Sequence, residues 1–80
     1  MAERATVARP YRPTSSNQLT TRELAVVEAV SWGATNLEIA RKLRISESTV
    51  KTHLRSAGVR LGVGDRAGIV GAAFRAGIIR

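Results

Sequence analysis

The chain has 80 residues, which suits a single small domain, and it contains no cysteine, so it forms no disulfide and offers no thiolate to a metal. Thirteen basic residues against six acidic ones give a net charge of +7, which favours a polyanionic partner. No apolar run approaches the roughly 20 residues of a membrane span, and the N-terminus lacks the apolar segment of a secretory signal. We therefore expect a cytoplasmic protein without a membrane segment. Eleven of the basic residues are arginine, as a GC-rich genome would also produce, so the charge identifies a partner only once it is located in space.

Residues 1–18 are predicted to form a flexible basic arm, and residues 19–80 a separate domain. The arm contains two prolines and several small polar residues, and it shows no apolar periodicity, which is typical of a disordered segment. Its three arginines against one glutamate suit contact with a DNA backbone or groove. A leader or a linker without a binding role is the simpler interpretation.

Four helices are predicted after the arm, over residues 21–32, 36–43, 46–61 and 66–76. Each begins after a residue whose side chain can accept a hydrogen bond from the helix N-terminus, namely Thr20, Thr35, Ser46 and Asp65. In the first two helices a glutamate three residues later completes a capping box. Glycine closes the first, third and fourth helices, at positions 33, 62 and 77, and Gly33 is expected to be left-handed. No strand pattern appears, so the fold class is all-α, with the second and third helices forming a helix-turn-helix.

Apolar residues at helical spacing predict the core. In the first helix the inward residues are Leu24, Val27 and Val30, with Ala25 and Val26 at the edges, and in the second they are Ile39, Ala40 and Leu43. In the third helix they are Val50, Leu54, Ala57 and Leu61, and in the fourth they are Ile69, Val70, Ala73 and Phe74.

Two features fit this pattern poorly. Trp32 and Leu37 are large apolar residues close to the first turn, and we expect them to pack on each other, with an exposed patch for a partner as the alternative. Gly58 lies inside the third helix, where glycine costs about 1 kcal/mol relative to alanine. We expect it to loosen or bend the C-terminal half of that helix.

The outer face of the third helix carries cations and hydroxyls. On a helical wheel centred on Val50, the residues about 100–200° away are Ser48, Lys51, Thr52, Arg55 and Val59. Lysine and arginine can donate to guanine, and threonine can contact thymine, so Lys51, Thr52 and Arg55 are the predicted base-contacting residues. Hydroxyls and N–H groups at the start of this helix suit phosphate oxygens. A solvated surface without a partner is the simpler alternative for such a face.

No enzyme chemistry is predicted. His53 is the only histidine, it lies at the edge of the buried stripe, and it has no nearby nucleophile or carboxylate that would make it a general base. We expect it to support the helix, with a phosphate contact as the second role. The chain shows no metal-ligand spacing, and we expect no metal and no cofactor.

The chain also resembles a known family. The segments LTTRE, WGATNLEIARKL, ISESTVKTH, LGV and AGII occur in the order typical of the LuxR/GerE-type DNA-binding domain, also called the FixJ or NarL type, and the resemblance covers residues 19–79. It implies a four-helix domain whose third helix enters the major groove and whose fourth helix dimerises. By this match Lys51, Thr52 and Arg55 contact bases.

The remaining site predictions combine the residues with that resemblance. Contacts to the DNA backbone are predicted for Ser46, Ser48, Thr49 and His53. The predicted dimer surface consists of Ile69, Ala72, Arg75 and Ala76, although Gly68 and Gly71 make that helix flat. Family members usually carry larger apolar residues where this chain has Ala57 and Gly58.

The leading hypothesis is therefore a small stand-alone regulator that binds double-stranded DNA in a sequence-specific manner, using helix 46–61 for recognition. A fragment of a longer regulator is the alternative to a stand-alone protein. A different class of function is a protein-interaction module that contacts RNA polymerase or another regulator through Trp32, Leu37 and the fourth helix, with DNA binding secondary.

Overall fold

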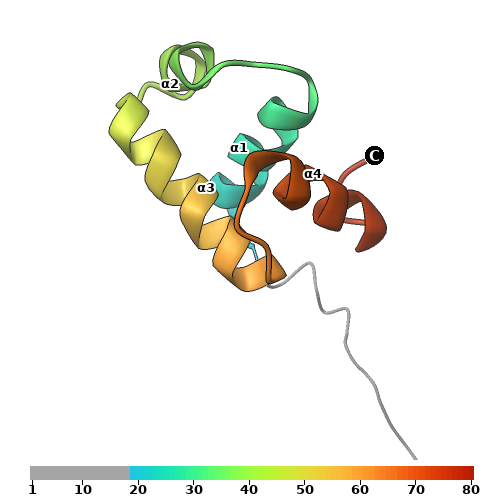
Figure 1. Ribbon diagram of the computed structural model, residues 1–80. Coiled ribbons are helices and arrows are strands. Elements are labelled where there is room, and N and C mark those ends of the chain that lie inside the picture. The colour runs from blue at the N-terminus through green and yellow to red at the C-terminus, as the bar shows by residue number, and fades with distance from the viewer. Residues whose placement is uncertain (1–18) are drawn as a thin grey trace, which may run out of the picture.

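A computed structural model describes residues 19–80, and within this range it contains four α-helices and no strand (Figure 1). The helices are α1 (Thr21–Ser31), α2 (Asn36–Leu43), α3 (Glu47–Leu61) and α4 (Arg66–Arg75). The all-α fold class is confirmed, and every predicted helix is found to within one residue at either end. The predicted arm, residues 1–18, lies outside the described residues.

The helix ends follow the local signals in the sequence. The Thr20 and Glu23 side chains each accept a hydrogen bond from the other residue's backbone N–H, both at 3.0 Å, and Thr35 and Glu38 form the same capping box at the start of α2. Ser46 and Asp65 cap α3 and α4. The three glycines that follow helices, Gly33, Gly62 and Gly77, have φ values of 90°, 78° and 74°. The left-handed backbone ends α1, α3 and α4 at these positions, and glycine suits them because L-residues with a Cβ rarely adopt this conformation.

The α3 helix is the centre of the packing, since it contacts α1, α2 and α4. Figure 1 shows α1 and α4 on the same side of α3, with α2 crossing near its N-terminal end. Among residues 19–80, no helix therefore packs on the opposite side of α3.

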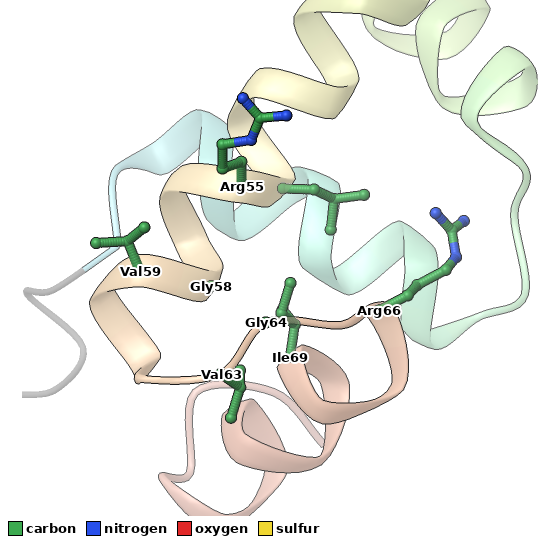
Figure 2. A pocket seen from close by; sticks show the side chains of 8 residues that line it. Arg55, Gly58, Val59, Val63, Gly64, Arg66 and Ile69 are labelled. Atoms are coloured by element: carbon green, nitrogen blue, oxygen red, sulfur yellow. The ribbon is translucent and has the colours of Figure 1, made fainter.

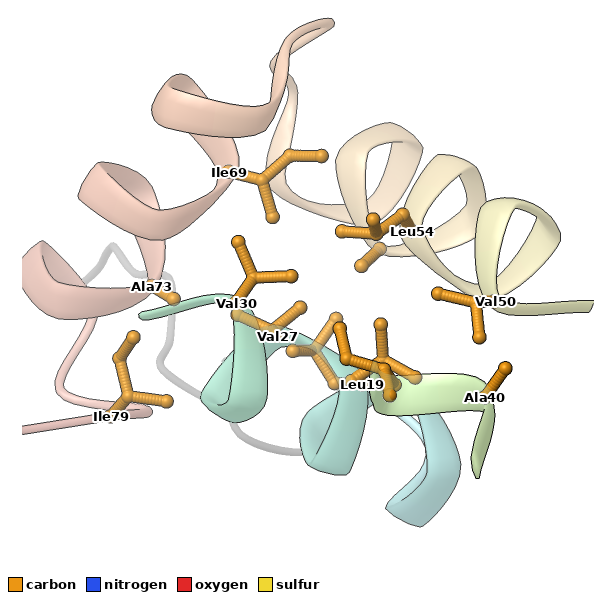
Figure 3. Close-up of a cluster of buried hydrophobic side chains, with 12 residues drawn as sticks. Leu19, Val27, Val30, Ala40, Val50, Leu54, Ile69, Ala73 and Ile79 are labelled. Carbon is orange, nitrogen blue, oxygen red and sulfur yellow. The ribbon is translucent and has the colours of Figure 1, made fainter. Parts of the chain in front are cut away.

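A small apolar core holds these helices together (Figure 3). Its buried members come from all four helices and both flanking segments: Leu19, Val26, Val27, Val30, Ile39, Ala40, Val50, Leu54, Ala57, Ile69, Ala73 and Ile79. The predicted inward stripe of α3 is confirmed, although Leu61 is only partly buried. Val26, which we expected at the edge of the core, is fully buried.

The prediction that Phe74 points inward was wrong, because its side chain is 47% exposed. After the left-handed Gly77 the chain folds back, and the N–H groups of Ile78 and Ile79 donate to the Ala73 carbonyl at 2.9 and 3.4 Å. This return places the Ile79 side chain in the core beside Ala73, as Figure 3 shows. Ile79, which follows the end of α4, thus takes the place in the core that we predicted for Phe74.

The expectation that Trp32 packs on Leu37 was also wrong. Trp32 is 80% exposed and Leu37 is 43% exposed. Trp32 is the C-cap of α1, and Gly33 turns the chain directly after it, so the indole stands at the end of the helix. An open cavity beside the ring is lined by Ala29, Ile39 and Lys42, and Leu37 takes no part in it.

Gly58 proves to be a packing position. The α3 helix continues through it to Leu61, and Gly58 is buried. A Cβ at this position would lie 2.7 Å from the Val63 carbonyl oxygen and 3.2 Å from Ile69 Cδ1. The Gly58 carbonyl also accepts a hydrogen bond from the Val63 N–H at 2.9 Å. The missing side chain therefore lets the loop before α4 approach α3, and we find no loosened segment here.

We predict that Gly58→Ala destabilises the domain by about 1–3 kcal/mol, because the added methyl group must displace backbone. For a domain of this size that lowers Tm by roughly 4–8 °C per kcal/mol. Gly64→Ala is the matched control, since a Cβ there meets nothing within 4 Å and the residue has no positive φ. The control should leave Tm unchanged or raise it slightly. Equal Tm values for the two variants in a thermal melt would contradict the packing role of Gly58.

A buried carboxylate connects α1 to α3. Glu23 is 4% exposed, and its Oε1 atom accepts from the Thr20 N–H and pairs with Arg60 Nε, both at 3.0 Å. The same oxygen thus closes the capping box of α1 and binds the last turn of α3. Arg60 stays half exposed, so the pair is not fully removed from solvent.

Glu23→Gln separates these two roles, because a glutamine carbonyl still completes a capping box but carries no charge. We expect it to lower the free energy of unfolding by about 1 kcal/mol, and Glu23→Ala to lower it by about 2–3 kcal/mol, since the alanine also leaves the Thr20 N–H without its acceptor. Urea unfolding curves measure both values. Glu28→Gln, at an exposed position of the same helix, is the control. If Glu23→Gln behaves like that control, the ion pair contributes nothing.

Candidate nucleic-acid interface

The predicted base-contacting residues lie together on the open side of α3. Lys51, Thr52 and Arg55 are all exposed, whereas Val50 and Leu54, their neighbours in sequence, are buried. Residues three and four apart share one side of a helix, so the three side chains form a single surface. Val59, one turn further on, extends this surface and is 76% exposed.

The Thr52 hydroxyl already has a hydrogen-bond partner. Its Oγ1 atom donates to the Ser48 carbonyl oxygen at 3.1 Å. A hydroxyl has one hydrogen and two lone pairs, so Thr52 presents an acceptor and a methyl group outward but no further donor. This limits the base edges that Thr52 can recognise.

The start of α3 is built around two hydroxyls. Ser46 Oγ accepts from the Thr49 N–H at 3.0 Å and lies 2.9 Å from Thr49 Oγ1. One hydroxyl hydrogen is used between the two side chains, and the other remains available to an outside acceptor. Ser46 and Ser48 are exposed, and Thr49 and His53 are half-buried. The helix N-terminus adds N–H groups that have no acceptor within the helix, and its dipole favours an anion.

Two arginines that contribute to the net charge serve the fold instead. Arg60 is paired with Glu23. Arg66, in the first turn of α4, donates from Nη1 to Asn36 Oδ1 and from Nη2 to the Ala34 carbonyl, both at 2.8 Å. It thereby ties α4 to the turn between α1 and α2. Nothing in the sequence indicates this contact, because it joins residues 30 and 32 positions apart.

A groove that the sequence did not predict runs between α3 and α4 (Figure 2). It has a volume of about 250 Å³ and is lined by Leu54, Arg55, Gly58, Val59, Val63, Gly64, Arg66 and Ile69. Figure 2 shows the Arg55 guanidinium directed away from Val63 and Ile69 at the base of the groove. Arg55 therefore stands at the rim, with its charge on the outer face of α3.

The predicted dimer surface needs one correction. Ile69 is 4% exposed, because its side chain packs in the protomer core, so it cannot contribute to a dimer surface in this conformation. Ala72 is partly buried, and Arg75 and Ala76 are exposed. The apolar residues that α4 does present outward are Ala67 and Phe74, with the half-buried Val70 between them. Their spacing of three and four residues places them on one side of the helix.

Other kinds of site find little support within residues 19–80. No group of three or more histidine, aspartate or glutamate side chains in this range could hold a metal ion. Among the same residues, no helix combines the length and the apolar character that crossing a bilayer requires.

Comparisons with known proteins agree on one group. The family model described as bacterial regulatory proteins, luxR family, matches residues 17–73. The CsgBAC operon transcriptional regulatory protein of Escherichia coli is 46% identical over 56 residues, which cover 70% of this chain and 26% of that protein. The HTH-type transcriptional activator RamA of Corynebacterium glutamicum is 40% identical over 70 residues, which cover 88% of this chain and 25% of that protein. The chain thus spans about a quarter of the length of these relatives.

Two solved structures share the fold. The transcription factor GerE matches with a TM-score of 0.75 and 28% identity, over 79% of this chain and 94% of that one. The response regulator ChrA of a heme-sensing two-component system matches with a TM-score of 0.74 and 35% identity, over 89% of this chain and 33% of that one.

Proposed function

The chain belongs to the luxR family of bacterial regulatory proteins, and we propose that it regulates transcription by binding DNA in a sequence-specific manner, with α3 as its major-groove recognition helix. The observation that carries this proposal is the exposed surface of Lys51, Thr52 and Arg55 on the second helix of a helix-turn-helix. In such motifs the second helix lies in the major groove and its N-terminal residues contact base edges. The cytoplasm is the compartment we propose, and we propose no enzymatic activity.

The three outward side chains offer different contacts to the bases. Lys51 and Arg55 can donate to guanine O6 and N7. Thr52, whose hydroxyl hydrogen is used on Ser48, accepts from the amino group of adenine or cytosine, or places its methyl group against that of thymine. We propose that these side chains read a half-site of a few base pairs.

Contacts to the DNA backbone hold the helix in register. We propose that the N-terminus of α3, with the hydroxyls of Ser46, Ser48 and Thr49, receives a phosphate, and that His53 supports the helix at the edge of the groove. Phosphate contacts carry no sequence information but supply much of the affinity, and they make it fall as salt rises.

Lys51→Ala tests the reading surface. We expect it to cost about 1–3 kcal/mol on the preferred site and much less on mixed-sequence DNA, because a base contact exists only on the correct sequence. The site is first obtained by selecting bound DNA from a random library. Titration of both DNAs at fixed salt then gives the ratio of affinities for wild type and variant.

Lys42→Ala is the control for that titration, since Lys42 is an exposed lysine on α2 and lies beside Trp32. It should leave the ratio of affinities unchanged. A loss of affinity by Lys51→Ala that is equal on both DNAs would show that Lys51 binds phosphate and reads no base.

Dimerisation through α4 is a second part of the proposal. The support for it is the outward apolar side of Ala67, Val70 and Phe74, next to a cavity of about 420 Å³ whose lining includes Val30 and Ser31 of α1. Two copies joined there would present two α3 helices to half-sites about 10 base pairs apart, or a multiple of that.

Phe74→Glu should convert the dimer into a monomer, because a charge would be buried at the centre of the contact. The core should tolerate the change, since Phe74 is half exposed in the protomer. Sedimentation equilibrium measures the mass directly, and circular dichroism checks that the variant is folded. A wild-type mass of one chain, or a dimer unaffected by the substitution, would contradict this interface.

Contact with RNA polymerase or another regulator remains a secondary proposal. The observation in its favour is Trp32, a large apolar side chain that is 80% exposed and borders cavities lined by α1, α2 and the turn between them. A gel shift on mixed-sequence DNA separates the two functions. Binding at low salt supports the DNA-binding proposal, and its absence would favour the interaction module.

A further inference from the structure

We propose that Arg44, in the turn between α2 and α3, binds a DNA phosphate and so anchors the start of the recognition helix. This inference rests on the proposed function and adds a binding residue that neither the recognition-helix pattern nor the family resemblance indicated. Three observations lead to it: the backbone conformation of Arg44, the surroundings of its side chain, and its place beside the N-terminus of α3.

The backbone of Arg44 is unusual. Its φ and ψ are 60° and 46°, and it is the one residue other than glycine between 19 and 80 with a positive φ. This left-handed conformation ends α2, because it lets both Arg44 and Ile45 donate their N–H groups to the Ala40 carbonyl. Glycine adopts it without steric strain and asparagine adopts it readily. The turn thus explains the conformation but does not explain why an arginine occupies it.

Residues 19–80 give the Arg44 side chain no structural role. It is exposed, and it forms no hydrogen bond or ion pair with any other described residue, in contrast to Arg60 and Arg66. It also lies outside the apolar core and the residues packed against it. Neither burial nor pairing within residues 19–80 offsets the unfavourable backbone, and we assign that compensation to a phosphate of bound DNA.

The position of Arg44 identifies that partner as DNA. Arg44 lies two residues before Ser46, the N-cap of α3, at the end of the helix that is proposed to enter the groove. Figure 1 shows the connection from α2 at this end of α3. When the N-terminus of a recognition helix enters the major groove, the helix before it crosses the sugar-phosphate backbone. A guanidinium at the junction of these two helices therefore meets phosphate oxygens, which it binds in a bidentate manner.

Lys42, in the last turn of α2, provides a matched comparison two residues before Arg44. Lys42 belongs to α2 and borders the cavity beside Trp32 and Glu28, whereas Arg44 follows the end of α2 and is not part of the lining of that cavity. The two cations are close in sequence and equal in charge, but only Arg44 lies in the turn that leads directly into the N-cap of α3.

The test measures DNA affinity as a function of salt for Arg44→Gly, Arg44→Asn and Arg44→Lys, with Lys42→Gln as the control. Neutralising one phosphate of B-DNA releases about 0.9 counterion, so Gly and Asn should make the slope of log K against log salt shallower by about 0.9. They should lower the affinity roughly 8-fold at 0.1 M salt, and the difference should vanish towards 1 M salt. Arg44→Lys keeps the charge and should keep most of the slope.

Two further readouts exclude a structural explanation. Tm should be unchanged or higher in Arg44→Gly and Arg44→Asn, because both residues fit the left-handed conformation. The loss of affinity should be equal on the selected site and on mixed-sequence DNA, because phosphates carry no sequence information.

The inference is overturned if Arg44→Gly and Arg44→Asn keep the wild-type slope, if Lys42→Gln changes the slope as much as they do, or if Tm falls together with affinity. A wild-type protein that binds no DNA at low salt would instead remove the proposed function itself.

Discussion

The orientation of α3 depends on the burial of Val50, Leu54 and Ala57 against the other three helices, and the missing side chain of Gly58 lets the loop before α4 approach the same helix. Rotating α3 by one residue would bring Lys51 and Arg55 towards the core and expose valine and leucine, at a cost of several kcal/mol in lost apolar burial and buried charge. Burial of the apolar side of α3 thus determines which of its side chains face outward. The Glu23–Arg60 pair adds to this constraint at the C-terminal end of α3, and the left-handed turn at Arg44 sets the entry at the other end.

Arginine has two distinct roles in this domain. Arg60 and Arg66 are held by a carboxylate, an amide oxygen and a carbonyl group, and they join helices that are distant in sequence. Arg55 and Arg44 are exposed and carry their charge outward. At least two of the thirteen basic residues therefore serve the fold, and the proposed function depends on where the other cations lie rather than on the net charge of +7.

Local features of the fold were predictable, because the residues that cause them are adjacent in the chain. Thr20 and Thr35 with their glutamates mark two helix starts, and alternation of apolar and polar residues along α3 separates Val50 from Lys51. Contacts between distant residues were not predictable in this way. Nothing near Phe74 shows that Ile79 returns to fill the core, and nothing near Gly58 shows that Val63 lies against it. The orientation of the recognition surface could be read from the sequence, whereas the Thr52–Ser48 hydrogen bond and the conformation of Arg44 required coordinates.

The central claim is that the outer side of α3 and the turn before it form the DNA-binding surface. The most direct measurement is an NMR titration of the 15N-labelled protein with a short DNA duplex, in which each backbone amide reports its own surroundings. The largest changes in chemical shift should fall on residues 44–55 and weaken as salt is raised, while the amides around Trp32 and Leu37 stay nearly constant. Changes concentrated on Trp32, Leu37 and α4, with α3 unaffected, would contradict the claim.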